Sequence, residues 1–383
     1  GLRDMRRVLP RRLHPGVAMK ETGSGVRREL MKGHEAICVG AIAAGCHFYY
    51  GYPITPQNDI PEYMSAHLPP LGGTFLQAES EIATINFLLG TSASGKRVMT
   101  SSSGPGISLM QEGLSYMAGS ELPAVIVNIS RSGPGLGGIA PSQGDYFQAV
   151  KCGGHGGYRM PVLAPHSVQE MYSLTMLAFD LADKYRNPAM ILGDAIIGQM
   201  KEPFVPTPYV SAVSEGKPWA LTGCAGRPRQ YVKSLYLKGD EIEVHNWKLH
   251  RKYLRMEEEE VRFEPYRLDG AAVVIIAFGT SARVTKTAIQ WAREEGLPVG
   301  MLRPVTLFPF PSRQVDEAAS RADVVLVIEM NTGQMLEDVR RSTRHHEKIR
   351  FLGKPCAMPT PEEIHGEIRR IAAEIGAKTG RGR

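Results

Sequence analysis

The segment RVMTSSSGPGISLMQEGLSYMAGSELPAVIVNIS, residues 97–130, decides the fold of this chain. Residues 97–101 and 124–129 are short apolar runs of the kind that forms buried strands. Between them, the small residues SSSGPG predict a turn, and the apolar periodicity of residues 107–117 predicts a helix. A strand, a helix and another strand in this order indicate a parallel sheet with crossover helices.

The same alternation continues on both sides of this segment. The first half of the chain predicts helices at 34–44, 54–67, 79–91 and 168–185, and strands at 47–50, 160–163 and 189–192. A second unit opens at Ala271, with expected strands at 271–279, 297–302 and 322–329 and expected helices at 282–294, 333–341 and 361–375. We therefore expect an α/β protein with one parallel sheet and a separate, smaller one.

Composition divides the chain into five parts. Residues 31–200 and 269–376 carry the two α/β patterns. Residues 201–268 are rich in Pro, Gly and charge and predict an irregular linker, whose acidic run EEEE is interpreted as a solvated helix face. Residues 1–30 predict a basic, disordered extension, with an Arg-rich targeting peptide as the alternative, and residues 377–383 predict a basic tail.

The net charge of +6 lies at the two ends of the chain. Residues 1–30 carry +5 and residues 378–383 a further +3, so the rest is slightly acidic. A nucleic-acid binding protein gathers positive charge on a folded face, and this distribution argues against that function. The hydrophobic fraction of 43% is ordinary for a globular protein, and no run of about 18 apolar residues predicts a membrane span.

Five cysteines are scattered along the chain without a CxxC pair: Cys38, Cys46, Cys152, Cys224 and Cys356. Iron–sulfur clusters and structural zinc sites use closely spaced thiolates, so neither is expected in this chain. The odd number also argues against a disulfide framework and favours the reducing cytoplasm. The N-terminal segment lacks the apolar stretch of a secretory signal.

Two motifs place polar groups where strands are expected to end, which is where ligands bind parallel sheets. In GYPITPQND, Thr55 stands at the start of an expected helix, whose free N–H groups attract anions such as a carboxylate. Thr55 could instead only cap this helix. Arg131 follows the buried strand 124–129, where it could bind a carboxylate through two hydrogen bonds or remain a surface residue.

Two glutamates, Glu79 and Glu81, open the expected helix in QAESEIATINF. Side chains two residues apart on a helix do not face each other, so these carboxyl groups cannot act as a pair. One is expected to point inward and the other to solvent, and the apolar periodicity does not decide which. Favourable placement near the helix dipole is the alternative to any function.

Taken together, these motifs resemble the α subunit of the thiamine diphosphate-dependent 2-oxoacid:ferredoxin oxidoreductases. The matching stretches are GYPITP, QAESEIA, TSSSGPGISLMQEG, ELPAVIVNISRSGPG, PSQGDYFQAVK, LAFDLADKYRNPAMIL, NTGQMLEDVR and PTPEEI. They follow one another within residues 31–375. The sequence is most similar to the branched-chain (3-methyl-2-oxobutanoate) type and also similar to the 2-oxoglutarate type. A non-oxidative thiamine enzyme half and a non-catalytic scaffold are the remaining alternatives.

The resemblance implies oxidative decarboxylation of a 2-oxoacid with coenzyme A, giving an acyl-CoA and carbon dioxide and passing electrons to ferredoxin. It implies that residues 31–200 form the pyrimidine-binding domain of thiamine diphosphate and residues 269–376 a transketolase-C-like domain. The chain lacks the GDG…N motif that holds Mg²⁺ and pyrophosphate. Partner subunits are therefore expected: a β subunit with that motif, a γ subunit and a ferredoxin-like subunit with the clusters.

The resemblance also assigns individual residues. Counting back from the TSSSG stretch without a gap, Glu79 rather than Glu81 matches the family's glutamate that contacts the aminopyrimidine. A carboxyl group at that position helps the ring remove the proton from thiazolium C2. Thr55 and Arg131 correspond to contacts with the substrate carboxylate. Further cofactor contacts are implied for Pro53, Ile54, Ser103 and Gly104.

Overall fold

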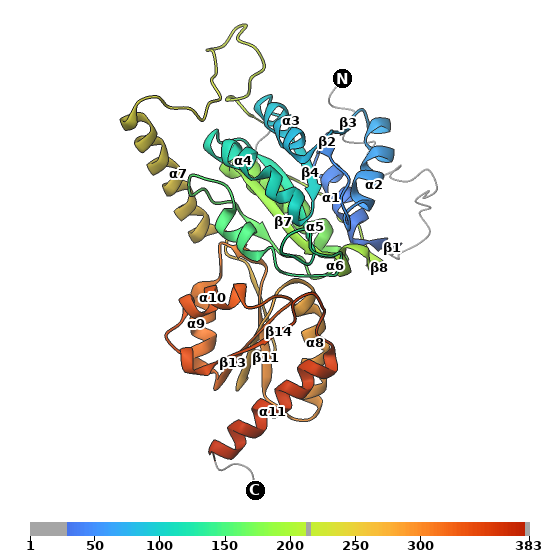
Figure 1. The fold of residues 1–383 in the computed structure, drawn as a ribbon, viewed down its shortest axis with the longest axis vertical. Coiled ribbons are helices and arrows are strands. Elements are labelled where there is room, and N and C mark those ends of the chain that lie inside the picture. The colour runs from blue at the N-terminus through green and yellow to red at the C-terminus, as the bar shows by residue number, and fades with distance from the viewer. Residues whose placement is uncertain (1–28, 212–215, 380–383) are drawn as a thin grey trace.

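A seven-stranded sheet lies at the centre of the larger part of the computed structural model, which describes residues 29–211 and 216–379 (Figure 1). The strand order is β12-β6-β7-β5-β4-β2-β3, and only the pair β12 and β6 is antiparallel. β5 and β7 are buried along their whole length, which explains their near-continuous apolar sequences. The strands are β2 (Phe48–Gly51), β3 (Thr74–Gln77), β4 (Val98–Ser102), β5 (Ala124–Ser130), β6 (Val162–Leu163), β7 (Pro188–Asp194) and β12 (Thr306–Phe308).

Helices cover both faces of this sheet. α1 packs against α5 on one face and α3 against α4 on the other (Figure 1). The strand–helix–strand unit predicted from the opening segment is confirmed, although α4 begins at Gly104 because Pro105 suits a first helical turn. The helices are α1 (Gly33–Ala43), α2 (Asp59–His67), α3 (Glu81–Ala93), α4 (Gly104–Gly119), α5 (Val168–Tyr185) and α6 (Ala195–Gln199), with short turns η2 (Pro69–Leu71) and η3 (Gln148–Cys152).

A separate five-stranded sheet, in the order β14-β13-β10-β11-β9, forms the second domain. The three predicted strands are its centre, and β14 and the antiparallel β9 extend it. Its strands are β9 (Phe263–Tyr266), β10 (Val273–Ile276), β11 (Val299–Pro304), β13 (Val324–Glu329) and β14 (Ile349–Gly353). Its helices are α8 (Gly279–Glu294), α9 (Ser312–Arg321), α10 (Gln334–Ser342) and α11 (Pro361–Thr379), with the turn η4 (His346–Lys348).

The two sheets are joined by more than a linker. β12, which follows β11 in the chain, leaves the second domain and pairs with β6 at the edge of the seven-stranded sheet. The Ala164 N–H donates to the Val305 carbonyl at 2.8 Å next to this pair. A strand of the C-terminal half therefore completes the first domain.

The prediction of an irregular linker is wrong for residues 239–259, which form the helix α7 (Gly239–Glu259). Its buried residues are Leu249, Tyr253 and Met256, which share one face of the helix. Charged residues fill most other positions and hide this periodicity in the sequence. The acidic run is solvated over its first three residues, but Glu260 is buried and accepts a hydrogen bond of 2.6 Å from the Lys184 ammonium group.

The structure differs from the predicted N-terminal extension at residues 29 and 30, and from the predicted C-terminal tail at residues 377–379. Most of the extension, residues 1–28, lies outside the described residues. Glu29 and Leu30 belong to β1 (Glu29–Lys32), which pairs with β8 (Lys201–Phe204). The last helix continues to Thr379, beyond its predicted end. No helix within the described ranges is long and apolar enough to cross a membrane.

Candidate functional site

Four neighbouring strands of the seven-stranded sheet end at one edge, and each leads into a predicted site residue. In sheet order they are β3, β2, β4 and β5. β3 leads to Glu79, β2 to the GYPITPQND turn, β4 to Ser103 and Gly104, and β5 to Arg131. Because these strands are parallel, their carboxyl ends lie side by side at an edge where such sheets bind ligands.

The GYPITPQND turn differs from its prediction. Thr55 does not cap a helix, because α2 begins at Asp59 with Asn58 at its N-cap position. The reason is local: the Asn58 side-chain oxygen accepts a hydrogen bond of 3.0 Å from the Ile54 N–H and closes a turn before the helix. Thr55 and Pro53 are exposed on this turn, and Ile54 is partly buried.

Gln57 fixes this turn to the sheet. Its buried side chain accepts a hydrogen bond from the Ser101 hydroxyl, which lies 2.6 Å from the Tyr49 hydroxyl. Its amide nitrogen donates to the Tyr52 carbonyl at 3.4 Å. Since Tyr49 lies in β2 and Ser101 in β4, two central strands hold the turn that carries Thr55.

Glu79 and Glu81 have opposite environments, as the sequence predicts. Glu79 is exposed in the short connection between β3 and α3, while Glu81 is 5% exposed in the first turn of α3. The Glu81 carboxyl group packs against Gly106 of α4, where even a Cβ atom would collide with it. Ser80, which lies between the two glutamates in the sequence, caps α3 by accepting a hydrogen bond of 3.2 Å from the Ala83 N–H.

Arg131 is buried against the turn that follows β2, so the alternative of a surface arginine is wrong. Its side chain is largely covered, and its Nη1 atom donates to the Thr55 carbonyl at 2.8 Å. Nη2 donates to the Leu136 carbonyl at 3.2 Å. The Nε–H is buried without a hydrogen-bond partner among the described residues. The structure thus brings Arg131 and Thr55 together.

Several other buried polar atoms at this edge lack a partner within the described part of the chain. They are Ser102 Oγ, Ser103 Oγ and Asn128 Oδ1. An unsatisfied buried group costs roughly 1–3 kcal/mol, so a cluster of them indicates a surface that hydrogen-bonds a ligand. Gly104 adds a left-handed backbone, with φ of 37°, and a Cβ atom there would contact the Arg131 side chain at 3.8 Å. The groups fit a flat, hydrogen-bonding ring such as the implied aminopyrimidine.

Asp145 is a site residue that the sequence reasoning missed. Its carboxyl group accepts a hydrogen bond of 3.1 Å from the Asn128 amide, inside the same edge of the sheet. Burial raises the pKa of Asp145, although the Asn128 amide, the Gly104 N–H and the Arg131 charge favour its ionised form. The signal in the sequence was Asn128, the polar residue inside the buried strand AVIVNI.

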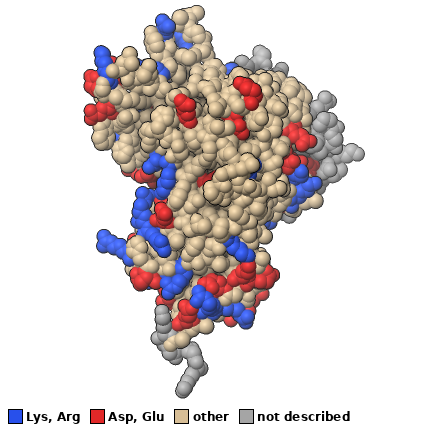
Figure 2. Space-filling view, in the orientation of Figure 1, with Lys and Arg blue, Asp and Glu red and all other residues tan. Residues whose placement is uncertain are grey.

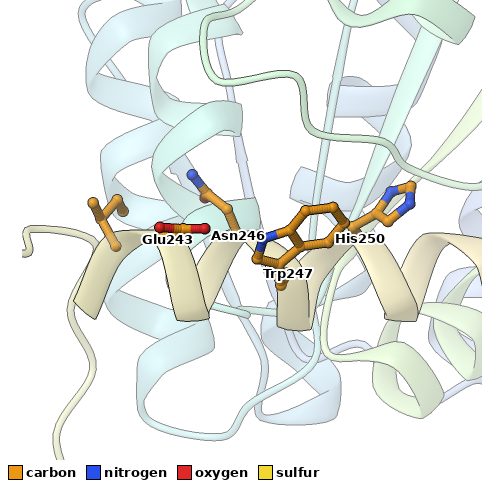
Figure 3. Close-up of a pocket in the computed structure, with 5 residues that line it drawn as sticks. Glu243, Asn246, Trp247 and His250 are labelled. Carbon is orange, nitrogen blue, oxygen red and sulfur yellow. The ribbon is translucent and has the colours of Figure 1, made fainter. Parts of the chain in front are cut away.

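Other features of the structure lie away from this edge. Figure 3 shows a shallow hollow along α7, lined by Glu243, Asn246, Trp247 and His250 together with Ile242. α7 contacts the far end of α4, where His245 lies 2.7 Å from the Gly119 carbonyl. Within residues 29–211 and 216–379, no group of three or more His, Cys, Asp or Glu side chains is arranged to hold a metal ion.

The chain matches two protein-family models. Residues 39–259 match the thiamine diphosphate-binding domain of pyruvate flavodoxin/ferredoxin oxidoreductases, and residues 271–363 match core domain II of pyruvate:ferredoxin oxidoreductase. The first match includes α7 and extends to the end of that helix.

Named relatives and a solved structure agree with these matches. The ketoisovalerate oxidoreductase subunit VorB of Methanothermobacter thermautotrophicus is 52% identical over 82% of this chain and 90% of its own length. The 2-oxoglutarate synthase subunit KorA of Archaeoglobus fulgidus is 40% identical over 82% of this chain and 91% of its own. The 2-oxoglutarate:ferredoxin oxidoreductase of Magnetococcus marinus, solved with 2-oxoglutarate, coenzyme A and succinyl-CoA, superposes with a TM-score of 0.83 at 29% identity, covering 90% of this chain and 65% of that one.

Proposed function

Because this chain belongs to the family of thiamine diphosphate-dependent 2-oxoacid:ferredoxin oxidoreductase subunits, we propose that it is the α subunit of a branched-chain 2-oxoacid enzyme. The observation that carries the proposal is the convergence of Thr55, Glu79 and Arg131 at one sheet edge within the matched domain. The overall reaction converts a 2-oxoacid and coenzyme A into an acyl-CoA and carbon dioxide. Two electrons pass to ferredoxin.

Thiamine diphosphate supplies the electron sink for decarboxylation when it is bound. In our proposal, the Glu79 carboxyl group hydrogen-bonds the aminopyrimidine ring, with Pro53, Ile54, Ser103 and Gly104 as its other contacts in this chain. The exposure of Glu79 in the single chain supports a cofactor that lies across a subunit boundary. A partner that covers this edge would exclude water from the carboxyl group.

The substrate carboxylate is proposed to lie between the Thr55 hydroxyl group and Arg131. Supporting this role, the Arg131 guanidinium is already oriented by carbonyl groups, and its Nε–H has no hydrogen-bond partner among the described residues. A charged donor held in place by the protein loses little freedom when the substrate binds. Thr55 is exposed beside it on a turn that Gln57 holds rigidly.

The charges at this edge favour a 2-oxoacid substrate with a branched, uncharged side chain. Segments 52–58, 78–80, 103–106 and 131–147 follow the four strands, and Arg131 is the single Lys or Arg in them. A 2-oxoglutarate substrate carries a second carboxylate, which would need a second cation or strong donors. The naming of the VorB relative as a ketoisovalerate oxidoreductase subunit points the same way. The second candidate is 2-oxoglutarate, because the KorA relative is also similar.

Partner subunits are proposed to bind the face around this edge. Figure 2 shows that much of the visible face of the first domain carries neither acidic nor basic side chains. Large apolar side chains are exposed on β3, α3, α4 and the loop after β5: Leu76, Ile82, Phe87, Leu109, Leu136 and Ile139. Such a patch marks a protein interface. We propose a β subunit here, carrying Mg²⁺ and the pyrophosphate site, with γ and ferredoxin-like subunits completing the complex.

The test is a substrate panel with the reconstituted complex. The complex receives 3-methyl-2-oxobutanoate, 2-oxoglutarate or pyruvate with coenzyme A and ferredoxin, and ferredoxin reduction is followed. We expect the highest kcat/KM with 3-methyl-2-oxobutanoate. A higher value with 2-oxoglutarate would replace the proposed substrate, and no turnover with any 2-oxoacid would refute the function.

A further inference from the structure

The loop that carries Asp145 is built into the second domain. We call residues 141–147, of sequence PSQGDYF, the QGD loop. Gln143 in this loop is 3% exposed, and its amide nitrogen donates to the Phe278 carbonyl at 2.9 Å. Its side-chain oxygen accepts two hydrogen bonds of 2.9 Å, from the Ser281 hydroxyl and the Met330 N–H. Every polar atom of the Gln143 side chain is therefore bonded to the second domain.

Two side chains of the NTGQM segment form hydrogen bonds with the backbone of the same loop. Asn331 donates to the Gln143 carbonyl at 2.9 Å. Gln334 bridges two loop residues, donating to the Gly144 carbonyl at 2.7 Å and accepting from the Phe147 N–H at 2.8 Å. These contacts lie on either side of Asp145 in the chain, so they fix the position of its Cα atom.

Buried Glu329 holds Asn331 and the start of α10 in place. It is fully buried at the end of β13 and accepts hydrogen bonds of 2.9 Å from the Asn331 amide and of 2.8 Å from the Met335 N–H. The Asn331 side-chain oxygen also accepts from the Gln334 N–H at 3.2 Å. The start of α10 is thus a rigid support for the QGD loop.

The Asp145 side chain points the other way, into the first domain. Its carboxyl group is bonded to the Asn128 amide of β5 at 3.1 Å and is influenced by the charge of Arg131. The same loop also reaches Arg131, because Pro141 at its start forms an isolated antiparallel β-bridge with Arg131. A displaced QGD loop would therefore move the backbone of Arg131 and the Asp145 charge that acts on its guanidinium.

We propose that the second domain sets the affinity of the enzyme for the 2-oxoacid carboxylate through the QGD loop, with Gln143, Asn331 and Gln334 as positioning residues for Asp145. The Asp145 charge in turn acts on Arg131, whose backbone the same loop holds through the Pro141 bridge. This inference rests on the proposed function, because it assumes that Arg131 contacts the substrate. It gives the second domain a part in substrate binding although none of its residues needs to touch the substrate.

The test compares variants of the complete complex in steady-state kinetics. Gln334→Met removes both bonds to the loop with little change in side-chain length, and Asp145→Asn removes the charge. The matched control is Lys286→Met, which removes a bond of 2.9 Å between the same two domains, from Lys286 to His166, away from the loop. We expect Gln334→Met and Asp145→Asn each to raise the KM for the 2-oxoacid about five- to tenfold, with the KM for coenzyme A unchanged.

A double variant separates positioning from general loosening. If Gln334 acts through Asp145, the double variant Gln334→Met, Asp145→Asn has a KM no higher than that of Asp145→Asn alone. Additive effects, or an equal rise in KM for Lys286→Met, would overturn the inference while leaving the proposed function intact. No 2-oxoacid turnover by the unmodified complex would refute the proposed function itself, and the inference with it.

Discussion

The Arg131 guanidinium donates a hydrogen bond of 2.8 Å to the backbone carbonyl of Thr55, across 76 positions of the chain. The bond joins the end of β5 to the turn after β2, over the strand β4 that lies between them. Two residues that the sequence indicates separately are therefore one structural unit.

Removing the guanidinium should mainly weaken 2-oxoacid binding. Arg131→Ala is expected to raise the KM for the 2-oxoacid roughly 10- to 100-fold, because a charged hydrogen bond contributes about 1.5–3 kcal/mol. Arg131→Lys keeps the charge but cannot bind both the Thr55 carbonyl and a carboxylate as a fork, so an intermediate KM is expected. Steady-state kinetics of the complex measures both values. An unchanged KM in Arg131→Ala would remove this residue from the substrate site.

Glu79→Gln should abolish turnover without preventing assembly. The expected fall in kcat is at least about 100-fold, since an amide cannot exchange a proton with the cofactor ring. Glu62→Gln, on the exposed side of α2, is the matched control and should keep full activity. Size-exclusion chromatography reports assembly and ferredoxin reduction reports turnover. Near-normal turnover in Glu79→Gln would contradict the proposed role.

The purified chain should bind thiamine diphosphate weakly when it is alone. In this chain, the residues proposed to contact the cofactor bind its aminopyrimidine ring. The GDG…N motif that binds the pyrophosphate is absent from the sequence. Isothermal titration calorimetry, with and without the β subunit, compares the two affinities. Equally tight binding by the chain alone would refute a cofactor site shared between subunits.

Gly106→Ala should destabilise the fold. A Cβ atom there would overlap the Ser102 hydroxyl and the Glu81 carboxyl group, and both are buried. The expected loss is about 1–3 kcal/mol of unfolding free energy. Gly90→Ala in α3 is the control: a Cβ there meets no described atom within 4 Å, so a gain of about 0.5–1 kcal/mol is expected. Urea unfolding measures the unfolding free energy of both variants, which should fall for Gly106→Ala and rise for Gly90→Ala.

The stability of the chain should fall in acid because of Glu170. Burial alone raises the pKa of this carboxyl group, but the His166 hydrogen bond and the Arg303 charge outweigh it and lower the pKa to about 2. A lowered folded-state pKa stabilises the fold above the ordinary value near 4.5. This stabilisation is lost as the pH falls from about 4.5 toward 2.

Glu170→Gln tests that dependence. The variant should be less stable than the parent near neutral pH, because Arg303 is buried and loses its bonds of 2.6 and 3.0 Å to the carboxylate. The difference in unfolding free energy, measured in urea at several pH values, should shrink toward pH 2. A difference that stays constant with pH would exclude the ionised carboxylate as its cause.

The sequence predicted the main architecture because unbroken apolar runs and helical periodicity report burial directly. It failed where charge or local bonding obscures that signal. In α7, charged positions surround a narrow buried stripe. In the turn after β2, Asn58 replaces Thr55 as the residue at the helix start. The resemblance supplied candidate residues, but Asp145 and Gln143 emerge only when two distant segments are brought together in space.

The pairing of β12 with β6 determines how this chain can be divided. A fragment that stops before Phe263 would expose the edge of β6 and leave the Ala164 N–H without its Val305 acceptor. Open edges of this kind recruit strands from other molecules. The two halves are therefore expected to fold as one unit, and an exchange of second domains between relatives must carry the β12 strand along with them.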